Sequence, residues 1–139
     1  QTVLDVLVKP DDEVFDCVTK YSGLVMDDFS GAVDTLDSVK QKLFEYINDR
    51  TILIGHGLFG DLKALRIIHH HVIDTSVCFT NKGRRPSLRH LAQQYLGMHI
   101  QSETHCSQED ALAALKLVVF GAQNPHVLSK GFKEALSAW

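Results

Sequence analysis

Asp61 has a position in the sequence that suits metal or acid chemistry. It follows the short apolar run 51–54 and a glycine-containing turn, and it falls near the start of a predicted helix. In an open α/β sheet, sites form outside the carboxyl ends of the strands, so this carboxylate suits a metal ligand or an acid. A carboxylate in the first turn of a helix is also stabilised by the helix dipole, which gives Asp61 a purely structural alternative.

His105 and Asp110 form a second candidate pair. His105 lies in a polar loop, and Asp110 falls in the first turn of the helix that follows. A loop histidine beside a carboxylate ligand can act as a general base. The segment 107–110 also fits the capping-box pattern, which would give Asp110 a structural role and leave His105 as a surface residue.

Basic residues gather in one loop and in the helix after it. Four of the 14 Lys and Arg residues are Lys82, Arg84, Arg85 and Arg89. They suit phosphate binding, with Arg89 beside the free N–H groups of its helix, whereas a solvated basic loop is the alternative. The three histidines at 69–71 are not expected to bind a metal, because adjacent side chains do not converge and no CxxC partner accompanies them.

Short apolar runs alternate with amphipathic stretches, which predicts an α/β layered domain. The expected strands are 2–8, 51–54 and 72–75. The continuous run 51–54 is typical of a central strand covered on both faces. The expected helices are 35–48, 61–68, a segment capped by Ser87, a segment opened by Ser107 and a last helix up to residue 139. Because 111–120 is apolar almost all round, that helix is expected to be buried.

The composition describes one ordinary globular domain. The chain has 139 residues, of which 45% are hydrophobic and 22% are charged, with a net charge of −3. This excludes a disordered tail, and no apolar run approaches the ~18 residues that a membrane span needs. Three widely spaced cysteines predict a reducing, intracellular compartment.

Several segments together resemble a known family. The matching segments are 51–58 (TILIGHGL), 61–65 (Asp61-Leu62 with Ala64-Leu65), 72–76 (VIDTS), 87–89 (SLR) and His105 with 109–111 (EDA). Residues 4–10 and 21–23 match as well. They resemble the DEDDh 3′→5′ exonucleases of the DnaQ-like superfamily, and most of all the Rex-type RNA exonucleases, followed by the catalytic subunit of the poly(A)-specific deadenylase. The last helix, 125–139, lies outside the resemblance.

The resemblance implies an RNase H-like mixed sheet flanked by helices and a 3′→5′ exoribonuclease that acts on single-stranded RNA 3′ ends. In that family four carboxylates bind two Mg²⁺ or Mn²⁺ ions, and a histidine takes the proton from the attacking water. Carried over by motif, Asp61 and Asp110 are metal ligands and His105 is the base. His56, Arg89 and the basic loop are the expected substrate contacts, and the nucleus is the expected compartment.

One motif of the family is missing. Its Asp-x-Glu on the opening, central strand should precede Leu4-Asp5, and the segment 5–7 is no substitute because Leu7 has no oxygen ligand. We therefore expect one N-terminally incomplete domain over 1–139, inactive as an isolated chain. Sequence outside this chain or a second copy would supply the missing strands. The alternatives are a non-catalytic nuclease-like scaffold that binds RNA or protein, and a nuclease acting on DNA.

Overall fold

The structure is a computed structural model that describes residues 1–80, 83–102, 104–130 and 132–133. In this part of the chain, two short parallel strands form the only sheet. The strands are β1 (Leu53–Gly55) and β2 (Val72–Asp74), with Leu53 opposite Val72 and Gly55 opposite Asp74. Helix α3 (Leu58–Leu65) connects them. This β-α-β unit confirms the predicted α/β class and two of its expected strands.

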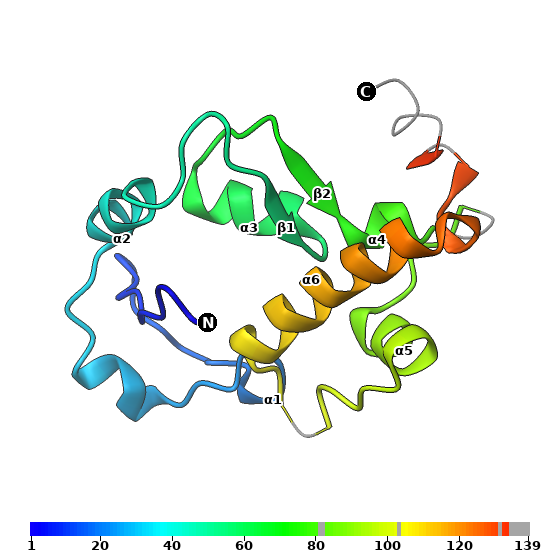
Figure 1. The fold of residues 1–139 in the computed structure, drawn as a ribbon. Coiled ribbons are helices and arrows are strands. Elements are labelled where there is room, and N and C mark those ends of the chain that lie inside the picture. Colours follow the sequence, from blue (N-terminus) through cyan, green and yellow to red (C-terminus); the bar gives the residue numbers. More distant parts are fainter. Residues whose placement is uncertain (81–82, 103, 131, 134–139) are drawn as a thin grey trace.

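The remaining elements are helical turns and one long helix. They are α1 (Thr19–Ser22), the 3₁₀ turn η1 (Met26–Ser30), α2 (Leu36–Phe44), α4 (Thr75–Cys78), α5 (Leu88–Leu91), the π-helical turn η2 (Ala92–Leu96), α6 (Ser107–Gln123) and the 3₁₀ turn η3 (Pro125–Val127). Figure 1 shows α6 running past the sheet, with α5 beside it. No helix among the described residues is long and apolar enough to cross a membrane.

Side-chain caps fix where two of the helices begin. The Ser38 N–H donates to Thr35 Oγ1 at 3.2 Å, and the Thr35 N–H donates to Ser38 Oγ at 3.0 Å, so α2 starts after Thr35. Ser87 Oγ accepts from the His90 N–H at 3.3 Å, which confirms Ser87 as the N-cap of α5. These hydrogen bonds satisfy N–H groups that have no partner within their own helix.

The core forms where α6 meets α5, η2 and α4. The buried face of α6 consists of Ala113, Ala114, Leu117 and Gly121. It packs against a cluster that includes Cys78, Phe79, Leu88, Leu91, Ala92, Ile100 and Leu128. A Cβ atom at Gly121 would come within 2.7 Å of a Leu128 methyl carbon, so a larger residue here would force the Leu128 side chain to shift.

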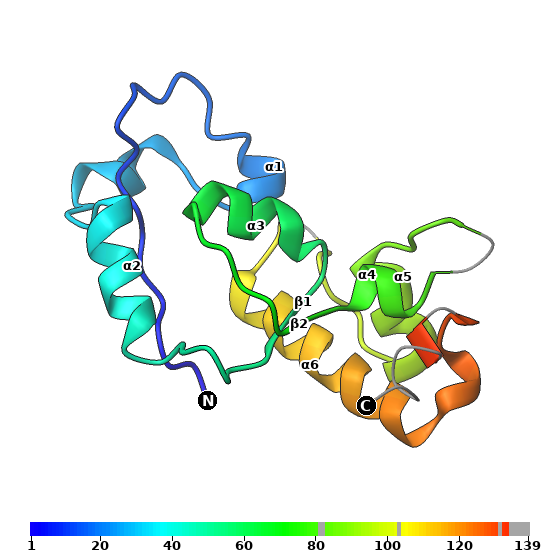
Figure 2. The same ribbon diagram turned by 90° about the horizontal axis from the view of Figure 1, so that it is seen from above.

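The N-terminal segment does not form the predicted strand. Within 2–8 only Val8 forms a bridge, to Asp34, and the Lys9 N–H donates to the Asp34 carbonyl at 2.7 Å. In both ribbon views residues 1–8 lie between α2 and the sheet, apart from β1 (Figures 1 and 2). The expected strand at 2–8 was wrong because the described chain offers these residues no neighbouring strand to pair with.

The predicted burial of the strand 51–54 on both faces and of the helix 111–120 on all sides was also wrong. Ile52, directly before β1, is 58% exposed, and Leu112, Leu115 and Val119 of α6 are 47 to 49% exposed. The strand is therefore not covered on both faces, and α6 keeps one apolar face open. Apolar side chains predict that a face can be buried, but they do not supply the element that covers it. Of the predicted last helix, 125–139, the described part starts with the 3₁₀ turn η3, and residues 131 and 134–139 lie outside the described residues.

Leu117→Ala should destabilise the protein by about 2–5 kcal/mol, because it opens a cavity in the core. Leu117 is fully buried, whereas Leu115 on the same helix is 47% exposed. Leu115→Ala is therefore the matched control, with an expected cost under about 1 kcal/mol. Equal losses in the free energy of unfolding, measured with denaturant, would contradict this assignment of the core.

Candidate functional site

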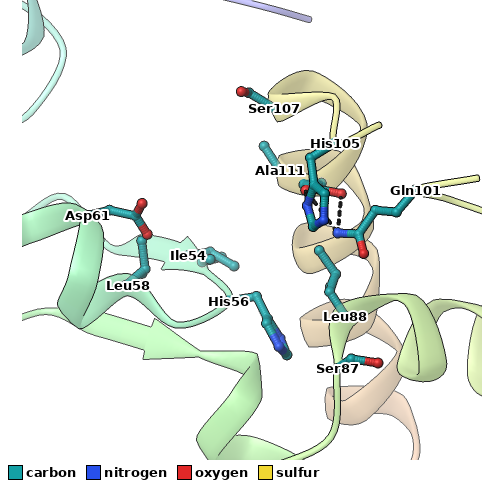
Figure 3. Close-up of a pocket in the computed structure, with 12 residues that line it drawn as sticks. Ile54, His56, Leu58, Asp61, Ser87, Leu88, Gln101, His105, Ser107 and Ala111 are labelled. Carbon is teal, nitrogen blue, oxygen red and sulfur yellow. Dashed lines mark hydrogen bonds and ion pairs between the residues drawn. The ribbon is translucent and has the colours of Figure 1, made fainter. Parts of the chain in front are cut away.

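A cavity of about 500 Å³ lies beyond the carboxyl end of β1, between α3, α6 and the start of α5. Its polar lining includes His56, Asp61, Gln101, His105 and Asp110. Four of these were predicted from the sequence, and they come from segments far apart along the chain (Figure 3). No Lys or Arg lies among the described residues of the wall, so the two carboxylates that face this space have histidines as their only basic neighbours in it.

Asp61 enters the cavity from α3. The helix starts after Gly57, whose φ of 77° is favourable only for glycine, and Asp61 follows in its first turn. Burial, reinforced by the charge of Asp74, raises the pKa of the Asp61 carboxyl. Figure 3 shows Asp61 on the opposite side of the cavity from His105. A bound cation at this position would offset the unfavourable desolvation of the carboxylate.

Asp110 faces the cavity from α6 and is held by two side chains. Gln101 Nε2 donates to Asp110 Oδ1 at 2.9 Å and to Oδ2 at 3.0 Å, and His105 Nδ1 lies 3.3 Å from Oδ2. The capping-box alternative for 107–110 was wrong: Cys106 is the N-cap of α6, and its side chain makes no cap hydrogen bond. The Asp110 side chain is therefore not used to cap its own helix.

His56 is held by a buried threonine. Thr75 Oγ1 donates to the Gly55 carbonyl at 2.9 Å and lies 2.9 Å from His56 Nδ1. Because the single hydroxyl proton is used toward Gly55, the Thr75 oxygen can only accept from His56, so Nδ1 is the donor in this contact. Burial lowers the pKa of His56, although the charges of Asp74 and Asp110 oppose this. Figure 3 shows the ring turned toward Ser87.

Asp74 ties the two strand ends together. Its Oδ1 accepts from the N–H groups of Gly57 and Ser76, each at 2.9 Å. Burial acts to raise the pKa of Asp74, but these hydrogen bonds outweigh it and lower the pKa. Burial and the nearby Asp74 charge raise the pKa of the Cys78 thiol to about 12, so this cysteine is not a nucleophile at neutral pH.

The predicted basic contacts lie elsewhere. Arg84, Arg85 and Arg89 are exposed, and none of them lines the cavity of Asp61 and Asp110. Arg84 instead lines a separate hollow with His90. Lys82 lies outside the described residues.

The run of three histidines has structural contacts. His69 Nε2 lies 2.6 Å from the Thr51 carbonyl, and His71 Nδ1 lies 2.7 Å from the Asp49 carbonyl. The two rings thus bind different carbonyl groups of the segment that leads into β1. These contacts connect the residues before β2 to those before β1.

The donor set of the cavity fits a divalent cation only in part. Among the described residues, no three His, Cys, Asp or Glu side chains are grouped so that they could hold a metal ion. Mg²⁺, however, is commonly bound by one or two carboxylates, with water and substrate phosphate as the other ligands. Asp61 and Asp110 match that chemistry, while two cations side by side would need more negative charge than these two residues supply.

Sequence reasoning missed Gln101 and Thr75 as parts of the site. Thr75 could have been found, because it directly follows β2 at the sheet edge where Asp61 follows β1. Gln101 carries no such signal. It lies in the loop between η2 and α6, and no sequence spacing connects a loop glutamine to Asp110.

Thr75→Val should cost about 1–3 kcal/mol of stability, because the Gly55 carbonyl and His56 Nδ1 lose their buried partner. Thr75 is fully buried, so valine fills the same space without the hydroxyl. Thr75→Ser keeps the hydroxyl and is the matched control, with a smaller expected loss. The measurement is denaturant unfolding of both variants, and a valine variant as stable as the serine variant would count against the hydrogen-bonded link.

The chain is similar to RNA exonucleases over most of its length. No protein-family model matches it. It is 43% identical over 133 residues to the putative RNA exonuclease pqe-1 of Caenorhabditis elegans, covering 91% of this chain and 8% of that protein. It is 42% identical over 127 residues to RNA exonuclease 3 of Candida albicans, covering 86% of this chain and 30% of that protein. The chain therefore spans less than a third of the length of these relatives.

Solved structures give the same relationship. The Pan2 catalytic unit of Neurospora crassa matches with a TM-score of 0.79 and 30% identity, covering 96% of this chain and 24% of the other. The Pan2 exonuclease module of Saccharomyces cerevisiae, solved with AAGGAA RNA, matches with a TM-score of 0.80 and 28% identity, covering 97% and 25%. These neighbours have the RNase H-like fold. The chain is thus a homologue of the Rex-type and Pan2 RNA exonucleases, consistent with the DEDDh 3′→5′ exonuclease superfamily.

Proposed function

We propose that this chain carries a divalent-cation-dependent 3′→5′ exoribonuclease site, with Asp61 and Asp110 as cation ligands and His105 as the general base. One observation carries the proposal: these three residues line a single cavity whose described wall has no Lys or Arg. The similarity to proteins named RNA exonucleases supports the reaction class. Mg²⁺ and Mn²⁺ suit the oxygen donors.

The proposed reaction is hydrolysis of the last phosphodiester bond. A water oxygen attacks the phosphorus, and the bond to the 3′ oxygen of the preceding nucleotide breaks. That oxygen takes up a proton from solvent to become the new 3′ hydroxyl, and a nucleoside 5′-monophosphate is released. His105 Nδ1–H donates to Asp110, so its Nε2 lone pair is the group that takes the proton of the water. A bound cation would supply positive charge for the phosphoryl oxygens.

Single-stranded RNA is the proposed substrate. The exposed Arg84, Arg85 and Arg89, together with Lys82, would contact phosphates upstream of the 3′ end, and His56 would contact the terminal nucleotide. The Pan2 neighbour was solved with RNA, which favours RNA over DNA. A side-by-side assay on matched RNA and DNA strands tests this preference. The nucleus is the proposed compartment of the protein.

A second function is favoured by the small number of ligands. The cavity offers two carboxylates, and no larger group of metal-binding side chains exists among the described residues. A nuclease-like domain of this kind could bind RNA or protein without cleaving it. Retention of His105 beside Asp110 favours the enzyme, because a binding module does not need a base next to a ligand.

We also propose that further strands complete the sheet, supplied by sequence outside this chain or by a second copy of it. Among the described residues β1 pairs only with β2, so its other edge is free. A hollow of about 780 Å³ is lined by residues 1–5 and by α6, where Gln108 Nε2 donates to Asp5 Oδ2. Its wall includes the half-exposed Leu112 and Leu115. A free strand edge beside an apolar face is an unstable combination in water.

If this is correct, the isolated chain should self-associate with rising concentration, or its β1 amides should exchange rapidly with solvent. Sedimentation and amide exchange on the same sample make the test. A clean monomer at high concentration with protected amides throughout 51–54 would show that the chain needs no further strands.

Asp61→Asn and Asp110→Asn should each weaken Mn²⁺ binding by about tenfold or more, because each removes a negative ligand. Calorimetry measures the affinity, and a 3′-labelled RNA assay measures shortening from the 3′ end. Asp37→Asn is the control, since Asp37 is exposed on α2 and pairs with Lys40 at 2.6 Å.

The result separates the two candidate functions. Mn²⁺ binding that is lost in both variants, and retained in Asp37→Asn, supports the exonuclease site. Equal binding by all variants would place the cation elsewhere. No binding by the unaltered chain would contradict a complete site in this chain. A chain extended upstream would then separate an incomplete exonuclease, which gains Mn²⁺ binding, from a non-catalytic scaffold, which does not.

A further inference from the structure

We propose that Gln101 is a positioning residue that holds the Asp110 carboxylate in place for a cation. This inference rests on the proposed function, because it concerns the same cavity. In this role Gln101 contacts Asp110, the proposed cation ligand, and acts on the cation only through it.

The contacts of Gln101 are directed at a single carboxylate. Its Nε2 donates to Asp110 Oδ1 at 2.9 Å and to Oδ2 at 3.0 Å. Because both carboxylate oxygens only accept hydrogen bonds, the chemistry requires the NH₂ end of the amide, and not its carbonyl, to face Asp110. The amide therefore restrains both oxygens at once, while His105 contacts only Oδ2. Figure 3 shows Gln101 reaching toward His105 from the loop beside α6.

The backbone of Gln101 is strained where it makes these contacts. Its φ is 55°, in the left-handed region that favours glycine. The preceding residue, Ile100, is only 2% exposed in the core, so the loop is anchored at this point. Strained residues that persist are typical of functional sites, where the surrounding packing holds them. A glycine here would relieve the strain but would lose the amide.

The charge of the amide suits the cavity. A Lys or Arg side chain could hold Asp110 more strongly, but it would neutralise the carboxylate and repel a cation. Glutamine orients the carboxylate without changing the negative charge of the wall, which has no Lys or Arg among its described residues. A neutral donor therefore leaves Asp110 free to bind a cation.

A purely structural role is the alternative, and the structure offers a way to separate the two. The Gln101 backbone N–H also donates to Glu109 Oε2 at 3.3 Å, so the loop stays tied to α6 without the side-chain amide. Arginine at position 101 would keep a donor toward Asp110 while adding a positive charge. A structural role tolerates that charge, whereas a role in cation binding does not.

The experiment compares Gln101→Gly and Gln101→Arg with the unaltered chain, by Mn²⁺ calorimetry and by thermal unfolding. Arg66→Gly is the matched control for the backbone, because Arg66 has the same φ of 55° at the C-terminus of α3, away from the cavity wall. We expect Arg66→Gly to raise the unfolding temperature and to leave Mn²⁺ affinity unchanged.

Both Gln101 variants should bind Mn²⁺ about tenfold or more weakly. Gln101→Gly should unfold at a temperature equal to or above that of the unaltered chain, and Gln101→Arg should stay folded. Unchanged Mn²⁺ affinity in Gln101→Gly would overturn the positioning role, because the amide would then not be needed to hold Asp110. Affinity lost in Gln101→Gly and restored in Gln101→Arg would overturn the requirement for a neutral donor. If the unaltered chain itself binds no Mn²⁺, the proposed function fails first, and the positioning role fails with it.

Discussion

The close packing of α6 beside two short parallel strands is the constraint on which the site depends. Small residues on its buried face, Ala113, Ala114 and Gly121, allow the helix to approach its neighbours. That approach places Asp110, in the first turn of α6, at the edge where β1 ends and α3 begins. Asp61 and Asp110 share one cavity because of this packing, although they are far apart in the sequence.

The cavity combines two partly buried carboxylates with a wall that has no Lys or Arg among its described residues. Burial raises the pKa of Asp61, and the same surroundings lower the pKa of His56, so both groups are disfavoured in their charged forms. Asp74 differs, because two backbone N–H groups stabilise its charged form. Hydrogen bonds thus make Asp74 a structural carboxylate, whereas burial favours the neutral forms of His56 and Asp61 and would make a bound cation favourable at Asp61.

Local pattern predicts the β-α-β unit and the cap at Ser87, because periodicity and spacing are properties of neighbouring residues. For Asp61, His105 and Asp110 it leaves a structural alternative open, and only the resemblance to a family selects them as site residues. Local pattern does not predict which element covers an apolar face. For that reason the strand expected at 2–8 and the full burial expected at 111–120 were wrong. Gln101 was missed for a related reason: its contact with Asp110 exists only after the loop and the helix have packed together.

A crystal structure of the chain grown with Mn²⁺ and a nucleoside 5′-monophosphate would show whether Asp61 and Asp110 bind a cation together, since the anomalous signal of manganese locates the ion. We expect a peak in the cavity with carboxylate oxygens of Asp61 and Asp110 about 2.1 Å away, the distance typical of small divalent cations. A peak elsewhere on the chain, or a nucleotide bound in the cavity with no ion between it and the two carboxylates, would contradict this expectation.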